Sequence, residues 1–413
     1  MRHTAMMQSR DVKDKLPLST WEFVALMAAL MSLNALAIDS MLPALGRIQE
    51  SYQLQRANDQ QLVLYVYVIG LGAPQLIFGP LSDSLGRRAI LIPCLLAYTA
   101  LSFACMIATS FSVLLLLRFL QGMAASGVRV VVVSVVRDLV AGRAMARIMS
   151  LIFTVFMIVP LIAPAIGQGI MIFASWQWTF GFLGICGIII SGWAFFRLPE
   201  THPKDRRQAL NLSQAFWAYR EVVKVRETLG YVAAGGVIFA TLFAFISSSE
   251  QIFSDVFNQG HRFALLFAII AGCITIGNLV NASLVERYGM RRISHIVLIF
   301  FISASVLNLS VTILFGTRLE IFLPLFSITI GCFGMMGSNF NAIAMEPQGK
   351  NTASASAAYG FASTLIASIL GWMVSSSYNE TLEPILLGYM CLGALTLVII
   401  LITEKGRLFG RKS

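Results

Sequence analysis

Long apolar stretches separated by short polar segments run through the whole chain. Twelve such stretches of roughly 20 residues or more can be placed, near 20–43, 61–81, 89–108, 112–134, 146–172, 178–196, 229–249, 262–284, 293–314, 320–344, 353–377 and 384–403. A helix of this length crosses the hydrocarbon core of a bilayer, which is about 30 Å thick. The pattern therefore predicts an all-α membrane protein with 12 transmembrane helices.

The pattern is interrupted between the sixth and seventh stretches, where basic and acidic side chains are mixed. This interruption divides the chain into a cytoplasmic N-terminus, a six-helix bundle, a cytoplasmic linker, a second six-helix bundle and a cytoplasmic tail. We place these parts at 1–18, 19–196, 197–228, 229–404 and 405–413. Within the linker, Phe216 and Trp217 suggest a short amphipathic helix on the membrane surface.

Composition supports the same class. Of the 413 residues, 57% are hydrophobic and 12% are charged, whereas a soluble domain carries about 25% charged residues. The net charge of +10 could indicate a nucleic-acid partner, but most of the Lys and Arg fall in loops on one side of the predicted spans. This positive-inside bias places both termini in the cytoplasm. We therefore expect the lipid bilayer, and no nucleic acid, as a partner.

The sequence offers no pattern typical of enzyme chemistry. The six cysteines lie in apolar stretches at no metal-ligand spacing, and the four histidines are scattered over termini and loops. Neither a metal site nor a disulfide framework is predicted. The G-x-x-x-x-G-K-[ST] loop that cradles nucleotide phosphates does not occur. We expect no enzyme activity, no metal and no cofactor.

One polar segment occurs twice. Between the second and third stretches the chain reads Gly-Pro-Leu-Ser-Asp-Ser-Leu-Gly-Arg-Arg at 79–88, and a related segment spans 284–292. The two correspond at a constant spacing of 203 residues, which relates Asp83, Gly86 and Arg88 to Glu286, Gly289 and Arg291. A spacing of about half the chain indicates duplicated halves. Gly79 and Pro80 are expected to end or kink the preceding helix, and Gly86 to permit a tight turn.

The first copy resembles the G-x-L-a-D-r-x-G-r-r signature of major facilitator transporters. The resemblance implies the major facilitator fold, with two six-helix halves related by an axis along the membrane normal. It also implies a conformational latch on the cytoplasmic side, comprising Gly79, Asp83, Gly86, Arg87, Arg88 and Asp138. The alternative is a plain cytoplasmic turn whose arginines only set the topology.

Two contacts of this latch can be anticipated. Asp83 should be drawn to the helix start near Asn351–Thr352 in the other half, where the helix dipole favours a carboxylate. Arg87 should pair with Asp138 at the inner end of the fourth span. We expect both contacts only while the cytoplasmic ends of the halves are closed.

Asp39 lies in the outer part of the first span, where an ionisable group is costly and indicates function. The segment D-x-x-L-P-A-L that begins at Asp39 resembles the Bcr/CflA branch of the drug:proton antiporters. The resemblance implies a role for Asp39 in handling protons or substrate. A second acid that some relatives carry earlier in this span is missing from Leu30–Ser32. The alternative is an interfacial residue that caps a helix end.

Arg118 opens an R-x-x-Q-G segment in the fourth span, which resembles a motif of the same antiporters. We expect Arg118 to face the cavity, close to Asp39, and to couple protons together with it. Burial favours a neutral acid and a nearby cation favours a carboxylate, so the two effects compete. Arg129 follows eleven residues later, about 20° round the helix from Arg118, and either shares its face or snorkels toward the cytoplasm.

The fifth span resembles the antiporter motif G-x-x-x-G-P-x-x-G-G in part. Pro160, Pro164 and Gly167 should make this helix bendable at the cavity wall, and Gln168 replaces one glycine of the motif. The residues expected to line the substrate cavity are Asn34, Tyr65, Gln121, Arg129, Glu250, Asn278 and Asn339. For the asparagines, interhelical hydrogen bonding is the alternative, and Glu346 is expected at the interface.

Taken together, the resemblance implies a proton-coupled antiporter that exports small amphipathic drugs or metabolites by alternating access. Its partners would be a small-molecule substrate, protons and the bilayer, and it would be a monomer in the bacterial cytoplasmic (inner) membrane, as a multi-pass protein. An uptake symporter or facilitator of the same fold is the alternative. A structural or sensory membrane protein would not need Asp39, Arg118 and Arg129 in the membrane.

Overall fold

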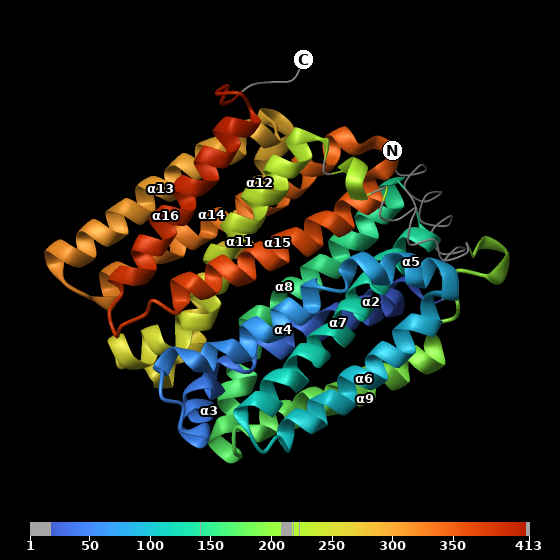
Figure 1. Cartoon of the computed structure of the whole chain (residues 1–413), viewed down its shortest axis with the longest axis horizontal. Helices are drawn as coiled ribbons and strands as arrows, with labels where there is room; N and C mark the ends of the chain where they lie inside the picture. Colours follow the sequence, from blue (N-terminus) through green and yellow to red (C-terminus); the bar gives the residue numbers. More distant parts are fainter. Residues whose placement is uncertain (1–17, 141, 208–216, 218, 223, 410–413) are drawn as a thin grey trace.

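The computed structural model describes residues 18–140, 142–207, 217, 219–222 and 224–409, and the regular elements in these ranges are helices (Figure 1). Eleven helices are long and apolar enough to cross a membrane, and one further pair, bent by 44°, brings the number of spans to as many as 12. The prediction of an all-α protein with 12 transmembrane helices is therefore confirmed.

The first six spans form one half of the molecule. They are α2 (Thr20–Asp39), α4 (Leu62–Gly72) with α5 (Gln75–Leu85), α6 (Arg87–Met106), α7 (Phe111–Leu139), α8 (Gly142–Phe173) and α9 (Gln177–Arg197), with the short α3 (Leu45–Tyr52) after α2. The second half comprises α11 (Arg226–Gln251), α12 (Phe263–Tyr288), α13 (Met290–Phe315), α14 (Leu319–Met345), α15 (Thr352–Ser375) and α16 (Glu383–Thr403).

Helices pair in the same way in both halves. In the first half α2 packs on α8, α4 on α7 and α6 on α9; in the second half α11 packs on α15, α12 on α14 and α13 on α16. Between the halves, α4 lies beside α15 and α8 beside α12 (Figure 1). Each of these contacts has its counterpart in the other half, as expected if the repeated segment marks a duplication.

Glycines allow one of these pairs to approach closely in both halves. A Cβ added at Gly122 of α7 would overlap the carbonyl oxygen of Tyr67 in α4, and one at Gly70 would overlap that of Phe119. At the α12–α14 contact, a Cβ at Gly334 would overlap the carbonyl oxygen of Ile274 in the same way. Membrane helices gain little from hydrophobic association, so close backbone packing of this kind stabilises them.

The second span bends at a different proline from the one expected. The break between α4 and α5 lies at Ala73–Pro74, whereas Pro80 lies inside α5. The helix therefore does not end at Gly79 and Pro80, as one of the two expected outcomes had it. Pro80 has no N–H for the carbonyl of Leu76, four residues earlier. That carbonyl accepts instead a hydrogen bond of 2.9 Å from the hydroxyl of Tyr219 in the linker.

The linker segment around Tyr219 contacts both halves. Burial raises the pKa of the Tyr219 phenol, so its hydroxyl stays protonated and can donate to Leu76 in α5. Three residues later, the carbonyl of Val222 accepts a hydrogen bond of 3.5 Å from Gln348, just before α15. Val222 itself is buried. This turn of the linker therefore spans the cytoplasmic ends of the two halves.

Replacing Tyr219 with Phe should lower the free energy of unfolding by about 1 kcal/mol, because the Leu76 carbonyl loses its donor. In a Pro80→Ala background the same replacement should cost little, because the new backbone N–H at position 80 can bond to Leu76. Denaturant unfolding of the four purified proteins in detergent measures this difference. An equal loss in both backgrounds would show that Tyr219 stabilises through packing alone.

Candidate functional site

The first span ends early, at Asp39. Pro43 follows four residues later and has no N–H to offer the Asp39 carbonyl, so the helix cannot continue in register. Ser40 closes the end, since its N–H and its hydroxyl both bond to the carbonyl of Leu36, at 3.1 and 2.6 Å. Asp39 is 4% exposed. The acid therefore lies at a helix end that is buried inside the bundle.

Arg118 holds this helix end in place. Its guanidinium donates to the carbonyl of Ala37 in α2 at 3.0 Å, to the carbonyl of Val63 in α4 at 3.1 Å, and to Gln121 at 2.7 Å. The group also lies over the Tyr67 ring, 4.3 Å from its centroid. Carbonyls in the last turn of a helix lack intrahelical donors and carry partial negative charge, so a cation is favourable there.

The ion pair expected between Arg118 and Asp39 is not formed within the described part of the chain. The three donor groups of Arg118 are directed at Ala37, Val63 and Gln121, and Asp39 has no salt bridge among the described residues. Arg118 therefore positions Asp39 through the backbone of α2, two residues away, rather than through its charge.

Helix α8 packs against the same helix end. A Cβ added at Gly167 would overlap the carbonyl oxygen of Ser40, so only glycine lets α8 approach the break in α2. Pro160 and Pro164 lie inside α8, which the structure describes as one continuous helix. Gln168, which departs from the antiporter motif, accepts a hydrogen bond from the N–H of Ala264 and donates to the carbonyls of Gly260 and His261 in the second half. No feature of the sequence indicated this last contact.

A polar cluster continues from Arg118 into the first half. Gln121 donates to the hydroxyl of Ser102 at 2.7 Å and is fully buried, so it supports Arg118 and does not line an open cavity. Tyr67 donates to Oδ1 of Asn34 at 3.1 Å. The Nδ2 group of Asn34 is buried and has no hydrogen-bond partner in the described structure.

The exposed side of α7 changes between its two ends. In the outer half, Leu116 and Leu120 are exposed while Arg118 is buried; in the inner half, Arg129 and Val133 are exposed. Arg129 lies nine residues from Leu120, about half a turn round the helix at 100° per residue. The face that is buried around Arg118 is therefore open around Arg129.

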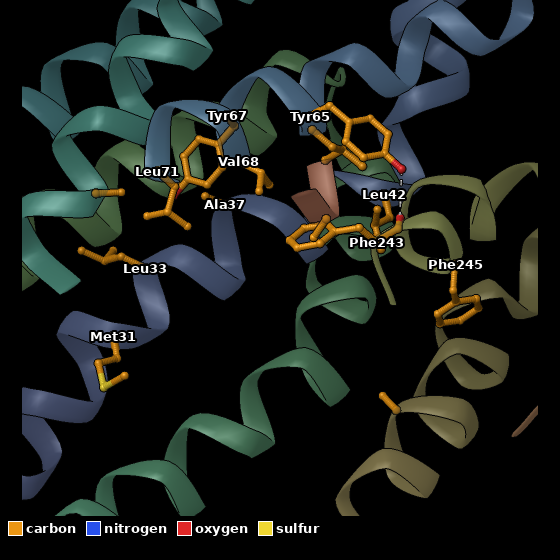
Figure 2. Packing of buried hydrophobic residues seen from close by; sticks show 14 of the residues in the cluster. Met31, Leu33, Ala37, Leu42, Tyr65, Tyr67, Val68, Leu71, Phe243 and Phe245 are labelled. Carbon is orange, nitrogen blue, oxygen red and sulfur yellow. Dashed lines mark hydrogen bonds between the residues drawn. The ribbon is translucent and has the colours of Figure 1, made fainter. Parts of the chain in front are cut away.

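Polar contacts between the halves gather at their outer ends. Tyr65 is buried and contacts the carbonyl of Phe243 in α11 (Figure 2) and the hydroxyls of Ser247 and Ser375. Gln61 donates to Gln251 at 2.6 Å. Tyr65 was expected to line the cavity, but in this structure it lies in the closed contact between α4, α11 and α15.

Two further residues expected in the cavity lie elsewhere. Glu250 accepts a hydrogen bond from Ser254 and faces α3, where a Cβ on Gly46 would lie 3.6 Å from its carboxylate, so it belongs to the outer contact between the halves. Asn339 exchanges hydrogen bonds of 2.8 and 3.0 Å with Asn281 and is buried. This pair joins α12 to α14, as the alternative interpretation of the asparagines had it.

Asn278 is partly buried and donates to the carbonyl of Ile274 within its own helix, at 3.3 Å. Of the seven residues expected to line the cavity, Arg129 and Asn34 keep donor groups that have no hydrogen-bond partner among the described residues. Both lie in the first half, in α7 and α2 respectively.

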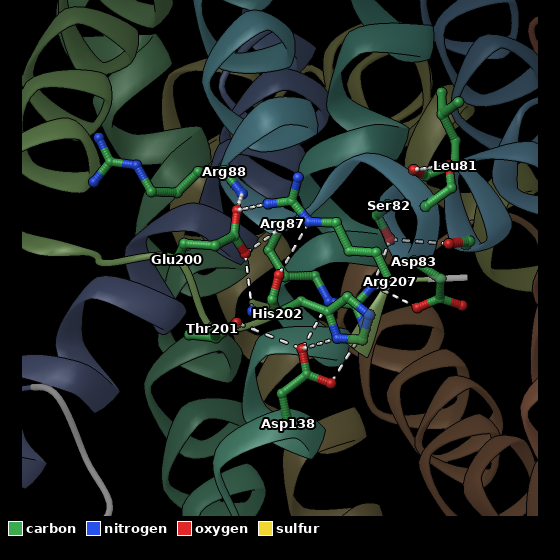
Figure 3. Close-up of polar contacts among 12 residues, drawn as sticks. Leu81, Ser82, Asp83, Arg87, Arg88, Asp138, Glu200, Thr201, His202 and Arg207 are labelled. Carbon is green, nitrogen blue, oxygen red and sulfur yellow. Dashed lines mark hydrogen bonds and ion pairs between the residues drawn. The ribbon is translucent and has the colours of Figure 1, made fainter. Parts of the chain in front are cut away.

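Arg87 is the centre of the cytoplasmic cluster in the first half (Figure 3). It contacts both carboxylate oxygens of Asp138, at 2.7 and 3.1 Å, and Asp83 at 2.6 Å. The expected Arg87–Asp138 contact is thus present. It lies within one half, however, so the expectation that it requires closure of the two halves is wrong. Asp83 pairs with Arg87 in its own half, and the side chains of Asn351–Thr352 lie outside the described residues.

The sequence interpretation missed Glu200, which completes this cluster. Its carboxylate accepts hydrogen bonds from the backbone N–H groups of Arg87 and Arg88, at 2.9 and 3.2 Å (Figure 3). These groups open α6 and have no intrahelical partner, so an anion is favourable there. Gly86 makes the preceding turn with a φ of 102°, as expected. Arg88 donates to the carbonyl of Leu198.

The repeated segment builds a similar cluster in the second half. Arg291 contacts Glu346 at 2.7 Å, Glu404 at 3.1 Å and Glu227 at 3.7 Å. Glu404 follows α16 as Glu200 follows α9. The start of the third helix is thus tied to the end of the sixth in both halves, by the Arg291 side chain on Glu404 in one and by the Arg88 side chain on the Leu198 carbonyl in the other. Glu346, expected only at the interface, is part of this cluster.

Comparison with known proteins agrees with this architecture. The family model of the Major Facilitator Superfamily matches residues 24–372, and the chain belongs to that family. It is 31% identical to an uncharacterized MFS-type transporter of Bacillus subtilis, over 86% of this chain and 88% of the other. It is 26% identical to a bicyclomycin resistance protein homolog of Haemophilus influenzae, over 89% of this chain and 92% of the other.

Two further comparisons agree with this family and with its fold. A chloramphenicol resistance protein of Pseudomonas aeruginosa is 33% identical over 60% of this chain and 58% of that protein. The crystal structure of a D-xylose–proton symporter superposes with a TM-score of 0.73 at 14% identity, over 94% of this chain and 99% of the other, which shows the shared fold. The chain is thus a multi-span transporter of the bacterial inner membrane.

Arg118→Ala should destabilise the protein, because three buried acceptors lose a charged donor at once. Arg118→Lys should recover only part of the stability, since an ammonium cannot serve the three acceptors with a planar fork. Thermal unfolding in detergent compares these variants with Arg47→Ala, whose side chain is 68% exposed. A lysine variant as stable as the unchanged protein would contradict the geometry described for Arg118.

The two acids that pair with Arg87 should differ in their effects. The Arg87 side chain is 2% exposed, whereas Asp138 is 13% and Asp83 is 45% exposed. Asp138→Asn should cost about 2 kcal/mol or more of unfolding free energy, because it weakens the buried pair. Asp83→Asn should cost less than about 1 kcal/mol. Equal losses in an unfolding experiment would assign both acids the same structural role.

Proposed function

We propose that the protein is a proton-coupled antiporter that exports small amphipathic drugs or metabolites from the cytoplasm by alternating access. The relatives named for resistance to bicyclomycin and chloramphenicol support drug efflux. One observation carries the proton part of the proposal. Asp39 is a buried acid at a broken helix end, and it has no salt bridge within the described part of the chain.

The state of the structure supports alternating access. Tyr65, Gln61 and Gln168 join the halves at the outer end. The inner half of α7 is exposed at Arg129 and Val133. These two features are the ones expected of a transporter that is closed to the outside and open toward the cytoplasm. Substrate would enter from the cytoplasm in this state and leave after the outer contacts separate.

Protonation of Asp39, at the end of α2, can be coupled to the transport cycle. A carboxylate is costly in a buried, apolar setting unless it is paired, so Asp39 can remain in its present position in the neutral form. Loss of the proton would favour a different arrangement around the end of α2. Since α7 and α8 both contact this end, through Arg118 and Gly167, a change at Asp39 acts on helices that pack against it.

Asp39→Asn should abolish accumulation driven by a proton gradient, because the amide cannot release a proton, while folding and membrane level stay unchanged. Binding of substrate in detergent should persist, since the amide resembles the protonated acid. Uptake of chloramphenicol into everted vesicles, with and without a proton gradient, is the measurement, and it also determines the direction of transport.

Asp205→Asn, at an exposed position in the linker, serves as the control and should transport like the unchanged protein. Full gradient-driven transport by Asp39→Asn would exclude Asp39 as the proton carrier. If the unchanged protein transports equally fast with and without the proton gradient, proton coupling is excluded.

A further inference from the structure

We propose that Arg129 and Asn34 form a donor subsite that selects neutral or anionic substrates rich in hydrogen-bond acceptors, and that disfavours lipophilic cations. The inference rests on the proposed export function, since it names the class of substrate that the same site would take.

Arg129 is the first part of this subsite. It is residue 19 of the 29 in α7 and is exposed, although Ser126, Val128 and Val131 around it are buried. A charged side chain at such a depth normally pairs or faces a water-filled path. Arg129 makes no salt bridge among the described residues, and it lies about half a turn from the exposed Leu120. Its guanidinium is therefore available to a ligand that arrives from the cytoplasm.

Asn34 supplies an independent observation. It is 8% exposed, its Oδ1 is occupied by the Tyr67 hydroxyl at 3.1 Å, and its Nδ2 has no partner. An unsatisfied buried donor costs free energy, which a ligand acceptor would recover. Tyr67 links the two residues, because its hydroxyl binds Asn34 and it interacts electrostatically with Arg129.

The charged side chains around the subsite determine which substrate charge it prefers. Arg118 and Arg129 both lie on this face of α7, and among the described residues neither forms a salt bridge with a carboxylate. A cationic substrate would meet the positive charge of Arg129 here without a carboxylate to offset it. A nitro, carbonyl or carboxylate group would instead find the planar donors of a guanidinium and an amide N–H.

The test is binding to the purified protein in detergent, without a proton gradient, for three probes: neutral chloramphenicol, anionic fluorescein and cationic ethidium. The unchanged protein should bind the first two more tightly than ethidium. Arg129→Gln should weaken binding of chloramphenicol and fluorescein by about tenfold, the factor that a charged hydrogen bond typically gives, and should leave ethidium unchanged or tighter. Arg129→Glu should reverse the order of the probes.

Arg137→Gln is the matched control, because Arg137 is another exposed arginine of α7, eight residues closer to the cytoplasm; it should bind all three probes like the unchanged protein. Asn34→Ala should weaken chloramphenicol binding without changing ethidium binding. Ethidium that binds the unchanged protein as tightly as chloramphenicol, or an Arg129→Gln variant that affects all probes alike, would overturn the proposal. Because binding needs no gradient, a failure of proton coupling would leave this result unaffected.

Discussion

The contact between Arg118 and the end of α2 is the interaction on which the site depends. A helix that stops inside a membrane leaves carbonyl groups without donors, and lipid cannot supply them. Arg118 provides a donor to Ala37 and ties α2 to Val63 in α4. The hydrogen bond from Arg118 to the Ala37 carbonyl stabilises the helix end at which Asp39 lies. The Arg118 guanidinium thus binds backbone carbonyls at the end of α2, and Asp39 forms no salt bridge among the described residues.

The same constraint explains the second span. Pro80 leaves the Leu76 carbonyl without its helical partner, and Tyr219 of the linker donates to it. In both places a proline frees a carbonyl or stops a helix, and a side chain from another element completes the hydrogen bonding. The first of these contacts joins helices within one half, and the second joins the linker to α5. At each break, a backbone carbonyl that has lost its donor within the helix is bound by a side chain from another segment of the chain.

Most of the fold could be predicted from the sequence, because the number, positions and duplication of the spans follow from hydropathy and from one repeated motif. The Arg87–Asp138 contact could also be anticipated, since it joins neighbouring helix ends within one half. The partners of Arg118 could not, because a guanidinium can reach backbone carbonyls that carry no sequence signal. Tyr65, Glu250 and Gln168 were misjudged or missed because their contacts join the two halves, and those depend on which side of the transporter is closed.

These differences separate two kinds of buried polar residue. Residues whose partners lie in the same half, such as Gln121 and Asn339, are satisfied in every state of a transporter whose halves move as units. Residues whose partners lie across the two halves, such as Tyr65, must exchange those partners when the outer contact opens. Arg129 and Asn34 belong to neither group, since each keeps a donor without a partner while the outer contact is closed. Such a donor is used neither by the fold nor by the closed outer contact, so it is free to bind substrate. The substrate subsite is therefore expected on the inner face of α7 and not around Arg118.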